Sequence, residues 1–114
     1  MTEIAHAGDV EQSIAEIIKS HSIVLFMKGS AFRPQCGFSA AVVAVLRHYD
    51  APVHTVDVLT DPALRQAIKA YSDWPTIPQL YIDGAFVGGC DIVREMHANG
   101  ELGELIAASR GAKS

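Results

Sequence analysis

Cys36 is the residue of this sequence with the clearest capacity for chemistry. It stands between an apolar run, Ile23–Met27, and a segment with helical apolar spacing that starts at Gly37. A cysteine at the start of a helix faces unpaired backbone N–H groups and the positive end of the helix dipole, and both favour the thiolate. Lys28 adds a positive charge nearby. The sequence therefore predicts a thiolate at Cys36.

The site lacks the second cysteine of a C-x-x-C redox pair. Three residues after Cys36 stands Ser39, so the pattern is C-x-x-S, with one thiol and no local resolving partner. The chain has two cysteines in all, which is too few for a disulfide framework. A thiol at this site must therefore find its reaction partner elsewhere.

The composition limits the class of protein. With 114 residues, 49% hydrophobic and 19% charged, the sequence predicts one soluble globular domain over residues 1–114. A net charge of −4 argues against nucleic-acid binding. The longest apolar runs, Ala40–Leu46 and Ile23–Met27, are too short to cross a bilayer. The first nine residues show no signal-peptide pattern, so we expect a reducing, cytoplasmic location.

Apolar spacing and turn residues predict nine elements. Asp9 is expected to cap the first helix, and Asp61 and Pro62 to start the third. Helices are predicted at Val10–His21, Gly37–Tyr49, Ala63–Ser72, Ile92–His97 and Glu101–Ile106. Strands are predicted at Ile23–Met27, Val53–Val58, Gln79–Ile82 and Ala85–Val87.

The order of these elements predicts an α/β fold. The strand Ile23–Met27 has no polar alternation, which is typical of a strand buried on both faces. Helices interleaved with the two early strands indicate a βαβ unit. Asp83-Gly84 is a strong hairpin signal that adds an antiparallel pair. We therefore predict a four-stranded mixed sheet flanked by helices on both faces, the thioredoxin-like fold.

Several side chains receive a structural interpretation. Trp74 is expected to pack beside the site, and Lys69 to lie on a solvated helix face. The five histidines lack metal-ligand spacing, which makes a zinc site improbable; His48, His54 and His97 are expected at or near the surface. The inner face of the second helix is predicted to carry Phe38, Val42, Val45, Leu46 and Tyr49.

Four sequence motifs, in order, resemble one known family over residues 9–108. They are Phe26–Gly29, Pro34–Ser39, Trp74–Tyr81 and Gly88–Ile92. Together they resemble the monothiol glutaredoxins of the Cys-Gly-Phe-Ser type, in the single-domain form. The loop Ser30–Arg33 departs from the family, which usually has a proline soon after Gly29.

The resemblance implies a site for glutathione. Three side chains match positions that contact the charged ends of the tripeptide, namely Lys28, Arg65 and Asp91. The backbone of Thr76 and Ile77 is expected to pair with the glutathione backbone. The full set of positions that match the family's glutathione contacts is Lys28, Arg65, Thr76, Ile77, Pro78 as a cis-proline, Cys90 mainly through its backbone, and Asp91.

The resemblance also implies a [2Fe-2S] cluster shared between two protomers. Such proteins carry clusters to iron-sulfur apoproteins, act in iron homeostasis and pair with BolA-like proteins. The ligand count agrees, because a cluster needs four thiolates or their substitutes. Cys36 and one glutathione thiol from each half of a homodimer supply four, so Cys36 is the predicted metal ligand.

Other interpretations stay open. Cys36 could instead be the sole nucleophile of a glutathione-dependent thiol-disulfide oxidoreductase that removes glutathione from proteins, so whether the protein is an enzyme is undecided. A redox-inert adaptor is a third, weaker alternative. Cys90 is interpreted as structural in preference to catalytic, with a regulatory disulfide or a glutathione adduct as alternatives.

Overall fold

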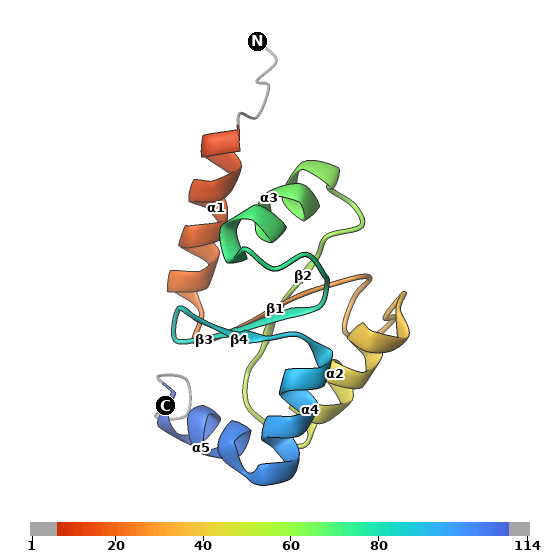
Figure 1. Cartoon of the computed structure of the whole chain (residues 1–114), viewed down its shortest axis with the longest axis vertical. Coiled ribbons are helices and arrows are strands. Elements are labelled where there is room, and N and C mark those ends of the chain that lie inside the picture. Colours follow the sequence, from red (N-terminus) through yellow and green to blue (C-terminus); the bar gives the residue numbers. More distant parts are fainter. Residues whose placement is uncertain (1–6, 110–114) are drawn as a thin grey trace.

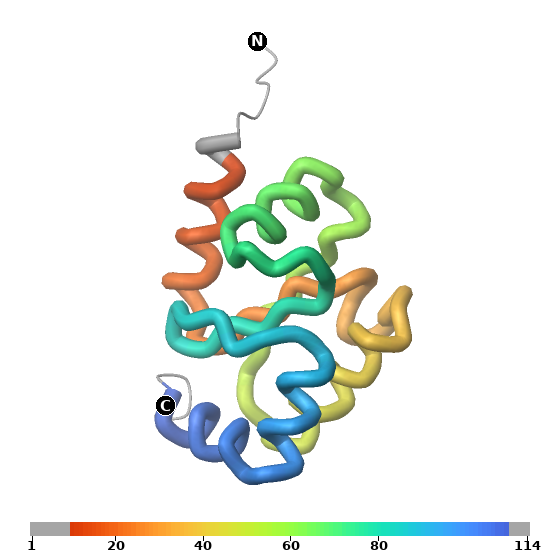
Figure 2. Tube along the Cα trace, viewed as in Figure 1, coloured from red at the N-terminus to blue at the C-terminus, as the bar shows by residue number. Residues whose placement is uncertain are grey.

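The computed structural model describes residues 7–109, and of residues 7–9 only the backbone. This part forms five helices and four strands in the predicted order (Figures 1 and 2). No helix in it is long and apolar enough to cross a membrane. In chain order the elements are α1 (Ala7–Ser20), β1 (Ile23–Met27), α2 (Gly37–Arg47), β2 (His54–Asp57), α3 (Pro62–Ser72), β3 (Gln79–Ile82), β4 (Ala85–Gly88), α4 (Cys90–Asn99) and α5 (Glu101–Ala108).

The four strands form one mixed sheet in the order β2-β1-β3-β4. The central strand β1 pairs in parallel with β2 and antiparallel with β3. A tight turn at Asp83-Gly84 joins β3 to the antiparallel β4, and both of its residues have positive φ, 50° and 83°. Asp and Gly tolerate that conformation, which matches the twist of a hairpin. The predicted fold is therefore confirmed.

Helices cover both faces of the sheet. Figure 1 shows α1 and α3 on one side, and α2, α4 and α5 on the other. Every residue of β1 is at most 1% exposed. Ile23, Leu25 and Met27 pack in the cluster under α2, α4 and α5, while Val24 and Phe26 pack under α1 and α3. The unbroken apolar run of β1 is explained by this double burial.

The predicted start of the first helix is wrong. Helix α1 begins at Ala7, so the backbone of Asp9 is already helical and Asp9 does not stand at the N-cap. Ala7 and Gly8 continue the helix by half a turn, which a capping pattern alone cannot exclude. The start of α3 is as predicted, because the side chain of Asp61 accepts a hydrogen bond from the Leu64 N–H at 3.2 Å and Pro62 follows directly.

The predicted inner face of α2 is wrong at Phe38, whose side chain is 63% exposed. The buried positions of α2 are Ser39, Val42, Val43 and Leu46. They form a regular helical stripe with i, i+3, i+4 and i+7 spacing. The stripe begins at the polar Ser39, one position after Phe38, and apolar spacing therefore assigned the wrong residue to the core.

His21, in the connection between α1 and β1, stacks face to face with His54, the first residue of β2. Their ring centroids are 3.8 Å apart and the rings are within 5° of parallel. Burial, and then the charge of His21, lower the pKa of His54. The folded chain therefore resists a proton at His54 that the unfolded chain accepts, so the contribution of His54 to stability is complete above the ordinary histidine pKa of about 6.5 and is lost below it.

We predict that His54→Gln reduces the acid sensitivity of folding. The melting temperature of the wild-type chain should fall between about pH 7.5 and pH 5.5, because these pH values lie on either side of the ordinary histidine pKa. The fall should be smaller in the variant. Thermal unfolding followed by circular dichroism measures both, and an equal fall in the two proteins would refute the linkage.

Candidate functional site

A groove of about 530 Å³ lies between α3, the segment before β3, the start of α4 and the first turn of α2. Seven of the eight residues predicted to bind a cofactor or metal line this groove. Cys36 is not among them, but it is the N-cap of α2 and lies two residues before Phe38, which is. The lining residues are Lys28, Phe38, Arg65, Lys69, Trp74, Pro75, Thr76, Ile77, Pro78, Gly89, Cys90, Asp91 and Ile92.

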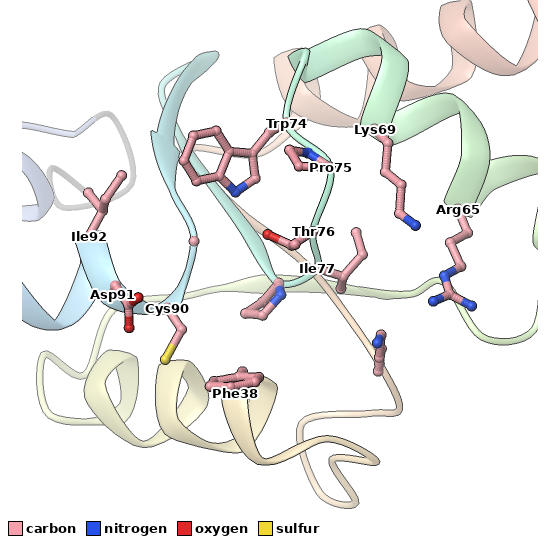
Figure 3. A pocket seen from close by; sticks show the side chains of 13 residues that line it. Phe38, Arg65, Lys69, Trp74, Pro75, Thr76, Ile77, Cys90, Asp91 and Ile92 are labelled. Atoms are coloured by element: carbon pink, nitrogen blue, oxygen red, sulfur yellow. The ribbon is translucent and has the colours of Figure 1, made fainter.

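The charges of the groove are separated in space. Figure 3 shows Arg65 and Lys69 of α3 on one side of the groove, and Cys90 and Asp91 of α4 on the opposite side. Thr76 and Ile77 lie between the two sides. A ligand that spans the groove would therefore meet cations at one end and, at the other, a carboxylate beside a helix N-terminus.

Cys36 has the electrostatic setting that the sequence predicts. It is partly exposed and has extended backbone angles at the N-cap of α2. The neutral thiol makes no cap hydrogen bond. The pKa of Cys36 is lowered, chiefly because the backbone N–H of Ser39 favours the thiolate, and to a smaller extent because the Phe38 N–H, the Lys28 charge and the Ser39 hydroxyl do so. Burial acts in the opposite direction and is outweighed.

The segment before β3 is held by a buried glutamine. The side chain of Gln79 is fully buried and donates hydrogen bonds to the carbonyl oxygens of Trp74, at 3.0 Å, and Thr76, at 3.2 Å. The peptide bond between Ile77 and Pro78 is cis, as expected. Gln79 therefore fixes the course of the chain along the floor of the groove, a function that sequence reasoning did not assign to it.

The approach of α4 to this segment leaves little space for a side chain at Gly89. A Cβ atom on Gly89 would lie 3.3 Å from the Pro78 carbonyl oxygen and 3.3 Å from Nε1 of Trp74. Gly89 is the N-cap of α4, so the close packing brings the unpaired N–H groups of the first helical turn to the wall of the groove. Asp91 lies in the same turn.

Two residues that line the groove each have a buried N–H group without a hydrogen-bond partner among the described residues. Among the described residues, Nε of Arg65 and Nε1 of Trp74 are buried and make no hydrogen bond. Buried N–H groups rarely remain unpaired in native proteins. Both belong to residues that line the groove, so a bound molecule with acceptor atoms would satisfy them.

Lys69, which was expected on a solvated helix face, lines the groove beside Arg65. The two residues are four apart on α3 and so share one face of the helix. That spacing was visible in the sequence and could have placed Lys69 with Arg65. Phe38, Pro75 and Ile92 also line the groove without having been predicted to do so.

The loop that departs from the family pattern forms a compact turn beside Cys36. The backbones of Ser30 and Arg33 exchange hydrogen bonds of 3.3 and 3.2 Å, and Gly29 bridges to Pro34. The side chain of Phe32 is 91% exposed at its tip. The loop is therefore ordered by its own hydrogen bonds and presents an aromatic side chain to solvent.

The described residues offer one accessible thiol. Both cysteines are free, but Cys90 is buried and Cys36 is not. The side chains that the structure describes include no group of three or more His, Cys, Asp or Glu that could hold a metal ion. Within this part of the chain, a multinuclear metal centre would therefore need ligands from other molecules.

Comparison with known proteins agrees with the site. Residues 23–87 match the Glutaredoxin family model. The chloroplastic monothiol glutaredoxin-S7 of Oryza sativa subsp. japonica is 52% identical over 100 residues, which are 88% of this chain and 60% of that protein. An uncharacterised monothiol glutaredoxin of Synechocystis is 47% identical over 98 residues, 86% of this chain and 92% of that one.

A solved structure has the same fold and a similar sequence. The solution structure of reduced poplar apo GrxS14 has a TM-score of 0.76 and 49% sequence identity, and the match covers 85% of this chain and 89% of the poplar chain. The family model, the relatives and the single cysteine of the Cys36–Ser39 motif agree. The chain belongs to the glutaredoxin family, among its monothiol members.

Proposed function

We propose that this protein binds glutathione and, as a homodimer, holds a [2Fe-2S] cluster between two protomers. In this role it stores clusters, transfers them to apoproteins and contributes to iron homeostasis. The observation that carries the proposal is the position of one accessible, low-pKa thiol, Cys36, beside a groove with cations at one end and a carboxylate at the other.

The charge pattern of the groove suits glutathione. The tripeptide has a carboxylate at its glycyl end, and a carboxylate and an ammonium at its γ-glutamyl end. Arg65 and Lys69 suit the glycyl carboxylate, and a guanidinium can bind it through two hydrogen bonds. At the other end, the first turn of α4 suits the second carboxylate, and Asp91 suits the ammonium. The glutathione thiol would then lie near the middle of the groove, towards Cys36.

The ligand count supports a shared cluster. A [2Fe-2S] cluster takes four thiolate ligands or their substitutes, and the described residues of one chain offer only Cys36 in an accessible position. Two chains with two glutathione molecules supply four thiolates. Cys36 would act as the protein ligand, and the groove would hold the glutathione ligand in place.

The partners follow from the same proposal. A cluster held partly by an exchangeable tripeptide can be passed to iron-sulfur apoproteins, whose own cysteines replace the ligands by thiolate exchange. A BolA-like protein as a second partner, and the cytoplasm as the compartment, rest on the resemblance and on the sequence pattern given above.

The alternative is a glutathione-dependent oxidoreductase, which the lowered pKa of Cys36 favours. The Cys36 thiolate would attack the glutathionyl sulfur of a mixed disulfide and release the protein thiolate. A second glutathione thiolate would then attack the Cys36–glutathione disulfide, which releases glutathione disulfide and regenerates Cys36. A colourless monomer with brisk activity of this kind would reverse the order of the two functions.

We predict that Arg65→Ala and Lys69→Ala each weaken glutathione binding about five-fold, the equivalent of roughly 1 kcal/mol for a partly exposed charge. Isothermal titration calorimetry with reduced glutathione measures the effect. Lys19→Ala on α1, which removes the same charge outside the groove, serves as the matched control. An unchanged dissociation constant in both groove variants would show that Arg65 and Lys69 are solvated surface residues that do not bind glutathione.

We predict that Cys36→Ser abolishes cluster assembly, because it removes the one accessible protein thiolate. Anaerobic reconstitution with iron, sulfide and glutathione should give a brown dimer from the wild-type chain and a colourless product from the variant. Cys90→Ser should keep most of the colour, since Cys90 is buried. Absorption spectra and size-exclusion chromatography distinguish these results, and a colourless Cys90→Ser protein would contradict the ligand assignment.

A further inference from the structure

The backbone of Lys28 is fixed at both of its polar groups. Its N–H donates a 3.1 Å hydrogen bond to the side-chain oxygen of Ser39, and its carbonyl accepts one of 2.8 Å from the Gln35 N–H. The next N–H, that of Gly29, donates to Oδ1 of Asp57 at 3.0 Å. Side chains from α2 and from the end of β2 therefore hold two consecutive peptide N–H groups.

Gly29 adds a steric constraint at the same place. Its φ angle is +89°, and a Cβ atom there would lie 2.5 Å from the Arg33 carbonyl oxygen and 2.7 Å from the Gln35 N. Only glycine adopts this conformation in that space without strain. The main chain at Lys28-Gly29 thus has little freedom, and the side chain of Lys28 leaves it from a fixed point to reach the groove.

Ser39 is the fully buried member of this arrangement. A buried hydroxyl is unfavourable unless it is hydrogen-bonded, and here it accepts from Lys28 across eleven positions of the chain. Ser39 also occupies the position where a C-x-x-C pair has its second cysteine. A thiol is a weak hydrogen-bond acceptor compared with a hydroxyl.

We propose that Ser39 is a positioning residue for glutathione binding: its buried hydroxyl fixes the backbone of Lys28 and thereby directs the Lys28 ammonium into the groove. The serine of the C-x-x-S motif then has a function of its own and is more than a missing thiol. A cysteine at this position would hold Lys28 less well. This inference rests on the proposed glutathione site. It makes the affinity of the groove for glutathione depend on Ser39, which does not line the groove.

The test is a double-mutant cycle on glutathione affinity, measured by calorimetry under reducing conditions. The variants are Ser39→Ala, Lys28→Met and both together. Ser39→Ala should weaken binding about three-fold or more, as expected for the loss of one hydrogen bond. Lys28→Met should weaken it at least as much. The Ser39 hydroxyl also hydrogen-bonds the sulfur of Cys36, so the cycle must separate the two contacts. The double variant should bind like Lys28→Met alone, because the proposed effect of Ser39 on glutathione passes through Lys28.

Two further variants keep the test decisive. Ser109→Ala is the matched control, since Ser109 is also fully buried and its hydroxyl donates to the Ile106 carbonyl, far from the groove in sequence and absent from its lining; it should leave affinity unchanged. Ser39→Cys is nearly isosteric, so it should keep the fold in case Ser39→Ala does not, and it should weaken glutathione binding as well.

The outcomes separate this inference from the proposed function. If the wild-type chain binds no glutathione, both are overturned. If the wild-type chain binds glutathione, and Ser39→Cys and Ser39→Ala bind it as tightly as the wild-type chain does, only the proposed function of Ser39 is overturned. Effects of Ser39→Ala and Lys28→Met that multiply in the double variant would also overturn it, because they would show that Ser39 acts independently of Lys28.

Discussion

Burial of β1 on both faces is the constraint on which the rest of the structure depends. Its five residues are excluded from solvent, so the strand is fixed between two layers of helices and cannot shift without exposing apolar surface on one side. Lys28 follows directly on this strand. The loop to Cys36 and the start of α2 are therefore built from a rigid origin, which is what a site of defined geometry needs.

The site is assembled from segments far apart in the sequence. The cations come from the end of β1 and from α3, the floor from the segment before β3, and the carboxylate and helix N-terminus from α4. Three of these segments are held by contacts outside the groove: Ser39 and the partly buried Asp57 hold Lys28-Gly29, Gln79 holds Trp74 and Thr76, and Gly89 lets α4 approach closely. Polar side chains outside the groove thus hold the main chain at Lys28 and along the groove floor.

Much of the fold was predictable because its signals are local. The apolar run of β1, the Asp83-Gly84 turn and the Asp61-Pro62 helix start each identify an element within a few residues. The errors arise where a local pattern competes with tertiary packing. Asp9 has the chemistry of a cap, yet α1 begins before it. Phe38 has the character of a core residue, yet the buried stripe of α2 begins at Ser39.

For the candidate site too, local motifs were predictable from the sequence and contacts between distant segments were not. The motifs located Cys36 and seven groove residues, whereas Lys69, four residues after Arg65 on the same face of α3, was not assigned to the groove that it lines. The contact of Ser39 with Lys28 joins two elements across a loop, and no spacing rule reveals it. Local chemistry was readable from the sequence, and the buried hydrogen bonds that position it were not.

The central claim is that Cys36 and glutathione together, from two copies of the chain, complete one ligand set. Native mass spectrometry of the anaerobically reconstituted protein tests it most directly. We predict a species with the mass of two chains, two glutathione molecules and one [2Fe-2S] cluster. A cluster-bearing species that contains a single chain, or two chains without glutathione, would contradict the claim.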